Sequence, residues 1–319
     1  TIARMSDPTH LLIAFAAGSP PEAREALRTL RLPRLERLLH RLQPLSPEPV
    51  DELAPETPHE RALAKALGLD AGPGRTPWAA HALHRAGRSP GTDAWAWITP
   101  CHWKVGREHV LMQDPDGLEL QEAPARELFS ALQTWFADDG VALHFDTPQR
   151  WLARGELFRD LVSASLDRVS GRDIGAWMPE SPQARTLHRL QSEMQMLLYT
   201  HPVNDAREAA GLPAVNSFWV SGAGALPPDL PAAAAPELDL SLRASALRQN
   251  WAAWAQAWQQ LDATRIDALL GALERGEPVR LTLCGERAWQ AFEAAPQGFF
   301  QRISGFFGTK PASMRLEQL

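Results

Sequence analysis

The chain has 319 residues, 45% of them hydrophobic and 22% charged, which is enough to build a large core in one domain or in two closely packed ones. Its formal net charge of −6 and the lack of a long basic run argue against nucleic acid as the main partner. The longest apolar run, residues 11–17, is far shorter than the roughly 20 residues that span a bilayer, and no basic leader segment precedes it. We therefore expect a globular, cytoplasmic protein without a membrane partner.

The N-terminal segment has the pattern of a strand followed by helices. Residues 10–16 form a short apolar run, and Ser19 with the two prolines after it supplies the turn and first-turn signals of a helix. Leucines then continue an apolar helical face, which Pro33 divides into two helices. Residues 43–58 are rich in proline and acidic residues and predict a surface loop, whereas residues 60–67 predict a short helix.

The middle of the chain mixes strand and helix signals. Residues 94–99 alternate like a strand, and residues 109–112 are a candidate partner for it. Residues 122–137 have the period of an amphipathic helix, and apolar residues alternate again over 141–145, which predicts a further strand. We therefore expect α+β structure in this part of the chain, in a subdomain separate from the N-terminal elements.

The segment of residues 187–224 is the most informative. It begins with a helix whose apolar residues lie on one stripe, namely Leu187, Leu190, Met194, Leu197 and Leu198. Pro202 ends that helix, and Asn204 is placed to cap a short second one. Residues 215–220 then predict a strand, and residues 221–224 predict a turn of the kind found where a strand ends beside a ligand crevice.

An aromatic seam marks the C-terminal part of the chain. Its residues repeat at spacings of four and three, as on one face of a helix: Leu247, Trp251, Trp254, Trp258 and Leu261. Asp262 is placed to cap a continuation of this helix, and residues 279–284 predict a buried strand. Gly285 and Glu286 then predict the start of another helix. Rings at helical spacing usually belong to a core.

The segment from His201 to Gly224 resembles part of a known enzyme family. The positions that carry this resemblance are His201, Pro202, Asn204, Arg207, Gly211, Asn216, Ser221, Gly222 and Gly224. They resemble a segment of archaeal-type cofactor-independent phosphoglycerate mutases, which belong to the alkaline phosphatase superfamily. Over nearly its full length the chain also resembles a proteobacterial family of RpfE-type regulatory proteins, also described as phosphoglycerate mutases. This second resemblance is carried by residues 151–154, 165–168, 177–179 and 189–224.

The resemblance implies an α/β fold with an alkaline-phosphatase-like mixed or parallel sheet flanked by helices. It also implies an inserted α+β subdomain, in agreement with the mixed signals in the middle of the chain. We therefore expect residues 1–90 and 201–319 to form the α/β core, and residues 91–200 to form the insertion.

The resemblance further implies two divalent metals held by Asp and His, and a serine nucleophile, because in-line phosphoryl transfer needs charge neutralised on the attacking and leaving oxygens. The corresponding positions differ in this chain. Ala17 and Gly18 stand in place of an Asp-Gly pair, His59 lies in the segment that should hold the serine, and residues 285–287 replace Asp-His-Ser. We therefore expect no metal and no other cofactor.

Two weaker sources of chemistry stay open. His59 is a candidate replacement nucleophile, although the sequence offers it no companion base. Cys101, His102, His109 and Cys284 are candidate zinc ligands, although they lack the CxxC or HxxxH spacing of such sites. The simpler interpretation of the two cysteines is that both are buried thiols.

Several polar residues are candidates for holding a phosphate or carboxylate. Arginine forks bind such groups bidentately, and amides and hydroxyls add hydrogen bonds. The candidate ligand-binding residues are His201, Asn204, Arg207, Asn216, Ser221, Arg150, Arg154, Arg168 and Arg172. Ser19 at a helix N-terminus adds a backbone anion site. The alternative is that the arginines form ordinary ion pairs.

Three functions fit these observations. The first is a non-catalytic, cytoplasmic regulatory or anion-binding relative of the mutases, with a small phosphorylated or carboxylated ligand. The second is a divergent phosphoglycerate mutase or phosphatase-type phosphotransferase. The third is a protein-interaction module that uses an exposed face made of Trp251, Trp254 and Trp258. The loss of the expected metal ligands favours the first.

Overall fold

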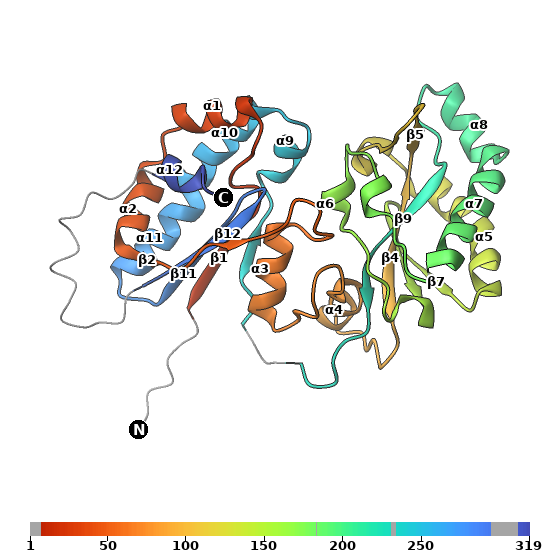
Figure 1. The fold of residues 1–319 in the computed structure, drawn as a ribbon, viewed down its shortest axis with the longest axis horizontal. Coiled ribbons are helices and arrows are strands. Elements are labelled where there is room, and N and C mark those ends of the chain that lie inside the picture. The colour runs from red at the N-terminus through yellow and green to blue at the C-terminus, as the bar shows by residue number, and fades with distance from the viewer. Residues whose placement is uncertain (1–7, 183, 231–233, 295–311) are drawn as a thin grey trace. The chain divides into compact units, whose positions relative to one another are not determined.

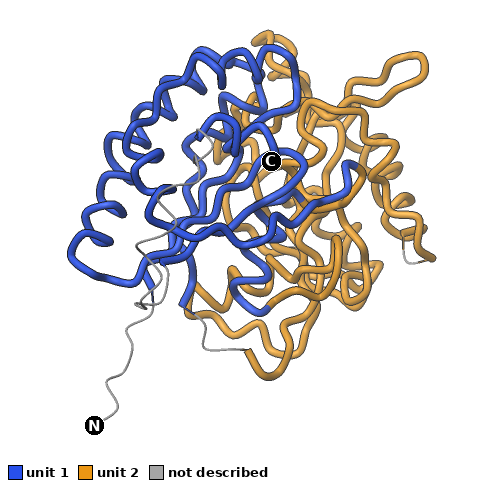
Figure 2. Tube along the Cα trace, turned by 60° about the vertical axis from the view of Figure 1, so that its left-hand side comes forward, with its two compact units in different colours: residues 1–52, 57–68, 232–319 blue, residues 53–56, 69–231 orange. Residues whose placement is uncertain are grey.

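The computed structural model describes residues 8–182, 184–230, 234–294 and 312–319. The chain divides into two compact units, which Figure 2 distinguishes by colour. Unit 1 comprises residues 1–52, 57–68 and 232–319, and unit 2 comprises residues 53–56 and 69–231. Within the described ranges, none of the helices combines the length and the apolar character needed to cross a membrane.

Unit 1 is built on a mixed six-stranded sheet with the strand order β10-β1-β11-β12-β2, and β3 also pairs with β12 (Figure 1). β1 lies between β10 and β11 and is parallel to both, whereas β12 runs antiparallel to β11, β2 and β3. The strands are β1 (Thr9–Ile13), β2 (Leu42–Pro44), β3 (Glu48–Pro49), β10 (Glu237–Asp239), β11 (Val279–Cys284) and β12 (Ala288–Ala294).

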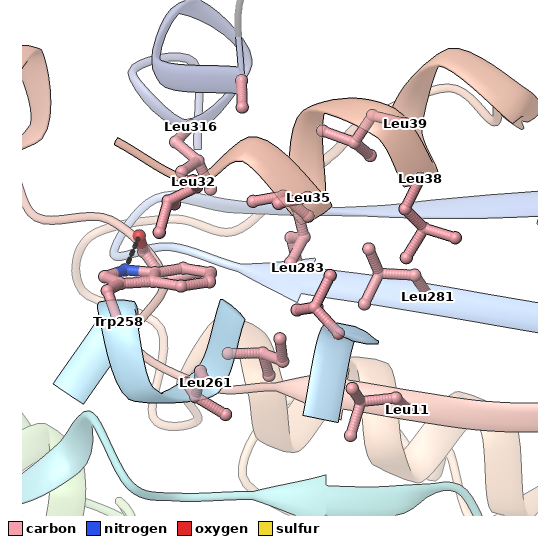
Figure 3. Packing of buried hydrophobic residues seen from close by; sticks show 14 of the residues in the cluster. Leu11, Leu32, Leu35, Leu38, Leu39, Trp258, Leu261, Leu281, Leu283 and Leu316 are labelled. Carbon is pink, nitrogen blue, oxygen red and sulfur yellow. Dashed lines mark hydrogen bonds between the residues drawn. The ribbon is translucent and has the colours of Figure 1, made fainter. Parts of the chain in front are cut away.

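The two faces of this sheet bury different helices, because successive residues of a strand point to opposite sides. Leu11 and Ile13 of β1 point into the larger core, and Leu12 points into the smaller one. In the larger core, leucines pack around Trp258 (Figure 3). Its helices are α1 (Pro21–Thr29), α2 (Pro33–Arg41), α10 (Trp251–Leu261), α11 (Asp267–Glu274) and α12 (Ala312–Leu316), while α9 (Arg243–Leu247) precedes α10. The smaller core is closed by α3 (Pro58–Leu67).

Local sequence signals set the ends of several of these helices. Both α1 and α2 begin with a proline, whose missing N–H would have no partner in a first helical turn. The α3 helix begins with a capping box, in which the Thr57 N–H donates to the Glu60 carboxylate at 2.7 Å. It ends at Gly68, whose φ of 68° is in the left-handed region that glycine adopts without strain. These ends agree with the predicted helices.

Unit 2 is built on an antiparallel four-stranded sheet with the order β7-β8-β4-β9. One face is buried by α5, α7 and α8, and the other is covered by α4. A separate hairpin joins β5 and β6. The elements are α4 (Trp78–Arg85), β4 (Trp95–Cys101), β5 (Trp103–Val105), β6 (Val110–Met112), α5 (Glu122–Asp138), β7 (Ala142–Thr147), β8 (Arg150–Arg154), α6 (Leu166–Val169), α7 (Ala184–Tyr199), α8 (Pro202–Ala209) and β9 (Ser217–Gly224).

The α/β class, with a mixed sheet flanked by helices, is confirmed. The observed division of the chain differs from the expected core of residues 1–90 and 201–319 with an insertion of residues 91–200. Residues 201–231 belong to unit 2 because β9 forms a long ladder with β4. Residues 69–90 join the same unit because α4 packs on β4 and β9.

Three local predictions were wrong, and each error has a physical cause. Residues 109–112 pair with β5 instead of β4, since β4 already has β8 and β9 on its two edges. Residues 221–224 continue β9 instead of forming a turn, because Ser221 and Gly224 pair with Trp97 and Trp95 of β4, with an irregularity between the two pairs. The residues after Gly285 form β12 instead of a helix, because the edge of β11 offers a backbone partner.

The interpretation of the aromatic seam as part of a core is confirmed, because Trp254 and Trp258 are fully buried. The alternative of an exposed interaction face was wrong, and so was the predicted role of Asp262. Asp262 does not cap its own helix, which continues through a π-helical turn over Asp262–Ile266. Its carboxylate instead accepts the N–H groups of Arg34 and Leu35, over 3.3 and 2.8 Å, and so caps α2.

Replacing Asp262 by asparagine should lower the free energy of unfolding by about 1–2 kcal/mol, because a neutral amide is the weaker acceptor at the N-terminus of α2. Urea unfolding followed by circular dichroism measures this loss. Asp267→Asn is the matched control, since Asp267 pairs with Arg34 at the surface and its loss should cost less than about 0.5 kcal/mol. Equal losses for the two variants would contradict the capping role.

The pH dependence of folding should reflect His10 in β1. Burial, followed by the charge of Arg280, lowers the pKa of His10 to about 4, and its ring Nε2 lies 2.8 Å from Thr282 Oγ1. Since the unfolded chain binds this proton near pH 6.5, stability should fall as the pH drops below that value, by at most about 2 kcal/mol at pH 5. His10→Gln should remove this part of the pH dependence, as urea unfolding at pH 7 and pH 5 would measure.

Candidate functional site

An open pocket of about 420 Å³ lies in unit 1 at the carboxyl ends of β1 and β11. Ligands of open α/β sheets bind in the crevice at this end of the strands, and the volume is typical of a small-molecule site. Residues 17–19 of the β1–α1 loop form one part of the wall, and residues 49–52, 287–288 and 316–319 form the rest. The pocket is therefore the candidate site of unit 1.

The two arginines that line the pocket have guanidinium N–H groups that can still donate hydrogen bonds. Arg24 projects from the first turns of α1, and Arg287 lies between β11 and β12. Both side chains are exposed, and neither guanidinium has an ion-pair or hydrogen-bond partner among the described residues. Each can therefore present its full fork of N–H donors to a carboxylate or phosphate.

Acidic side chains share the same pocket and limit the charge that it can accept. Asp51 and Glu52 are exposed on the wall beyond β3. Glu317 also lines the pocket, where its carboxylate pairs with Arg28 at 3.3 Å. The combination of two arginines with these carboxylates suits a ligand with one anionic group and further polar groups better than a bare, highly charged anion.

The backbone anion site predicted at Ser19 is already occupied by the protein itself. The Ser19 N–H, just before α1, donates to Glu286 Oε2 at 2.8 Å. A carboxylate is favoured at this position because it meets free N–H groups and the positive end of the helix dipole. A ligand anion would therefore have to displace Glu286 to bind at Ser19, whereas Arg24 and Arg287 need no displacement.

His59, the candidate nucleophile, lies in the first turn of α3. It is buried, with its Nδ1 2.9 Å from Thr57 Oγ1 and its ring centroid 5.1 Å from that of Phe15. It does not line the pocket described above. These contacts belong to the helix start and to packing, and a nucleophilic role for His59 stays a prediction.

The predicted ligand-binding residues of the 201–216 segment make hydrogen bonds to the backbone. The His201 ring accepts the Val203 N–H at 3.2 Å and so caps α8, the role that was predicted for Asn204. Asn204 itself donates to the carbonyls of Leu198 and Val215, and accepts the Val215 N–H, each at 2.8 Å. The segment is thus held in place by the side chains that were expected to contact a ligand.

Arg207 and Asn216 extend this pattern. Arg207 is buried, and its Nε donates to the Pro213 carbonyl at 2.8 Å, while its Nη2 donates to the Leu118 carbonyl. Asn216 accepts the Trp103 N–H at 2.7 Å and donates to the Trp103 carbonyl at 2.9 Å. Ser221 is buried within β9. Ligand binding by these residues stays a prediction.

The four remaining arginines are distributed over unit 2. Arg150 pairs with Asp146 at 3.0 Å, and Arg154 pairs with Asp93 at 3.2 Å, both near the surface. Arg168 is buried and donates to the Glu56 carbonyl at 2.8 Å. Arg172 follows α6, where its carbonyl accepts the Met112 N–H. Arg150 and Arg154 thus form the ion pairs that were the alternative to ligand binding.

The four candidate zinc ligands contact other groups of the protein. Cys101 and Cys284 are fully buried free thiols, and burial raises the pKa of both. His102 Nδ1 lies 2.7 Å from the Ala214 carbonyl, and His109 Nδ1 lies 3.0 Å from an Asp173 carboxylate oxygen. In the part of the chain that the structure describes, these cysteines and histidines do not gather into a metal-sized cluster.

The pocket arginines were missed by sequence reasoning. Arg24 looks like an ordinary exposed helix residue, and Arg287 lies in a segment that was expected to be helical. The available signal was positional, since Arg24 follows the first strand and Arg287 follows β11, the strand that lies beside it. Parallel neighbours bring their carboxyl ends to one edge, so both loops had to meet there.

Similarity to known proteins was found among solved structures. No model of a protein family and no curated protein matches the sequence. The chain is similar to a cofactor-independent phosphoglycerate mutase from Thermoplasma acidophilum, at 13% identity and a TM-score of 0.38, over 91% of this chain and 90% of that one. It is also similar to the PH0037 protein from Pyrococcus horikoshii, at 11% identity and a TM-score of 0.42, over 91% of this chain and 88% of that one. At TM-scores this low, the two likenesses carry no conclusion about function.

Proposed function

We propose that this chain binds a small anionic ligand in the unit 1 pocket and does not transform it. The observation that carries the proposal is the pair of arginines on the wall of a pocket at the carboxyl ends of β1 and β11, namely Arg24 and Arg287, whose guanidinium groups have no partner among the residues that the structure describes. Free guanidinium groups at such an edge favour a carboxylate or a phosphate. Asp51 and Glu52 favour a ligand that also carries hydroxyl or amino groups.

The residues at this edge also support binding without catalysis. The family that the sequence resembles has metal-binding residues after the first strand and after the last core strand. This chain has Ala17 and Gly18 at the first position and residues 285–287 at the second. Alanine and glycine have no side-chain group that can ligate a metal, and among residues 285–287 only Glu286 has one, whose carboxylate accepts the Ser19 N–H. The residues at these two positions therefore lack the Asp and His ligands of the paired-metal chemistry of phosphoryl transfer. A cytoplasmic regulatory role of the RpfE type agrees with such a site.

Calorimetric titration with inorganic phosphate, 3-phosphoglycerate, succinate and serine tests the proposal. At least one of these should bind the wild-type chain, and Arg24→Gln and Arg287→Gln should each weaken its binding about tenfold or more, because each removes a charge-assisted hydrogen bond. Arg31→Gln is the matched control. It makes the same change of charge at an exposed arginine of unit 1 outside the pocket and should leave the affinity unchanged.

Three outcomes would count against this function. If none of the four probes binds, the proposed function fails. It also fails if affinity falls equally in all three arginine variants, since such a fall would reflect net charge alone. Manganese-dependent turnover of 3-phosphoglycerate that disappears in His59→Ala would instead favour the second function, a divergent mutase or phosphatase. In that case the pocket described here would not be the site of chemistry.

The charge of Glu286 should oppose the binding of anions. Its carboxylate already accepts the Ser19 N–H at the wall of the pocket, so a second anion nearby is repelled. Glu286→Gln keeps a hydrogen-bond acceptor and removes the charge. We expect this variant to bind the same anionic probe several-fold more tightly than the wild type in the same titration. Unchanged affinity would place the bound anion away from Ser19.

A further inference from the structure

The β1–α1 loop reaches the pocket through an unusual backbone conformation. Phe15 has a φ of 56°, in the left-handed region that side chains other than glycine seldom adopt. Such a residue persists where its surroundings fix it, and fixed backbones of this kind are concentrated at functional sites. Residues 17–19, the part of this loop that lines the pocket, begin two positions after Phe15.

Two indole N–H groups hold this loop from the adjacent helix. Trp254 Nε1 donates to the Phe15 carbonyl at 2.9 Å, and Trp258 Nε1 donates to the Ala16 carbonyl at 3.2 Å, the bond drawn in Figure 3. On the strand side, the Ala16 N–H donates to the Cys284 carbonyl at 2.7 Å. Successive peptide groups of the loop are thus fixed by α10 and by β11.

The three tryptophan rings of the seam contact one another in sequence. The rings of Trp251 and Trp254 lie edge to face with centroids 5.9 Å apart, and those of Trp254 and Trp258 lie 6.3 Å apart in the same way. A Cβ atom at Gly18 would meet the Trp251 ring at 3.0 Å, so the loop passes close beneath that ring. All three rings therefore contact or bond the loop that forms the pocket wall.

We infer that Trp254 and Trp258 are positioning residues of the ligand pocket, through the hydrogen bonds that their indole N–H groups make to the β1–α1 loop. This inference rests on the proposed function. A ring that served packing alone would need only its apolar mass, and a phenylalanine would supply most of it. The N–H groups instead fix the backbone that presents residues 17–19 to a ligand.

Trp254→Phe and Trp258→Phe test the inference, with Trp289→Phe as the matched control. Trp289 is a buried ring of unit 1 that makes no hydrogen bond to the loop. Hydrogen exchange of the Ala16 and Ser19 amides, both hydrogen-bonded in the folded chain, reports the loop without any ligand. Exchange at these amides should be at least tenfold faster in each test variant than in the control, at equal stability to urea. If one of the two test variants does not fold, the other alone tests the inference.

Titration with inorganic phosphate, or with whichever of the four probes the wild type binds, gives the second readout. Each test variant should bind it at least fivefold more weakly than Trp289→Phe. Exchange and affinity that match the control in both test variants would overturn the inference. If no probe binds the wild type, the proposed function fails, while the exchange measurement still supports or overturns the positioning of the loop.

Discussion

Burial of β1 on both faces is the constraint on which unit 1 depends. The strand lies between two parallel neighbours, with Leu11 and Ile13 in one core and Leu12 in the other. Over Leu11–Ile13, where both faces are buried, the strand has no freedom of register, because a shift by one residue would exchange the two cores. Its carboxyl end is therefore fixed relative to β11, and the loops that leave this edge necessarily meet. The pocket follows from this arrangement.

Buried polar groups of unit 1 mainly satisfy the backbone. Asp262 accepts two N–H groups at the start of α2, and Trp254 and Trp258 each donate to a carbonyl of the β1–α1 loop. A buried peptide group without a partner costs about 1–3 kcal/mol, so each of these contacts compensates a cost that the fold itself creates. The tryptophans of the aromatic seam thus have two roles, since the same rings fill the core and hold the loop that forms the wall of the pocket.

The sequence predicted the elements whose signals are local. The two helices divided at Pro33, the helix that ends at Gly68 and the buried strand Val279–Cys284 were all found, because proline, glycine and apolar period act within a few residues. The sequence did not predict the pairing of residues 109–112 or the strand after Gly285. Both depend on which strand edge has unpaired backbone groups. The site was missed for the same reason. Arg24 and Arg287 come from opposite ends of the chain, and only the order of the strands brings them together.

The 201–224 segment shows that residues which carry a resemblance to an enzyme family can serve the fold itself. Asn204 joins the end of α7 to the residues before β9, and Arg207 joins the loop after α8 to the Leu118 carbonyl. Removing either side chain would leave buried backbone groups unpaired, which is costly whether or not the protein has a substrate. Sequence alone could not separate this role from ligand binding. An asparagine is the same letter in the sequence whether its amide bonds to the backbone or to a ligand. Such a motif is therefore evidence for how the chain is folded at this point, and evidence about function has to come from side chains that the backbone does not occupy.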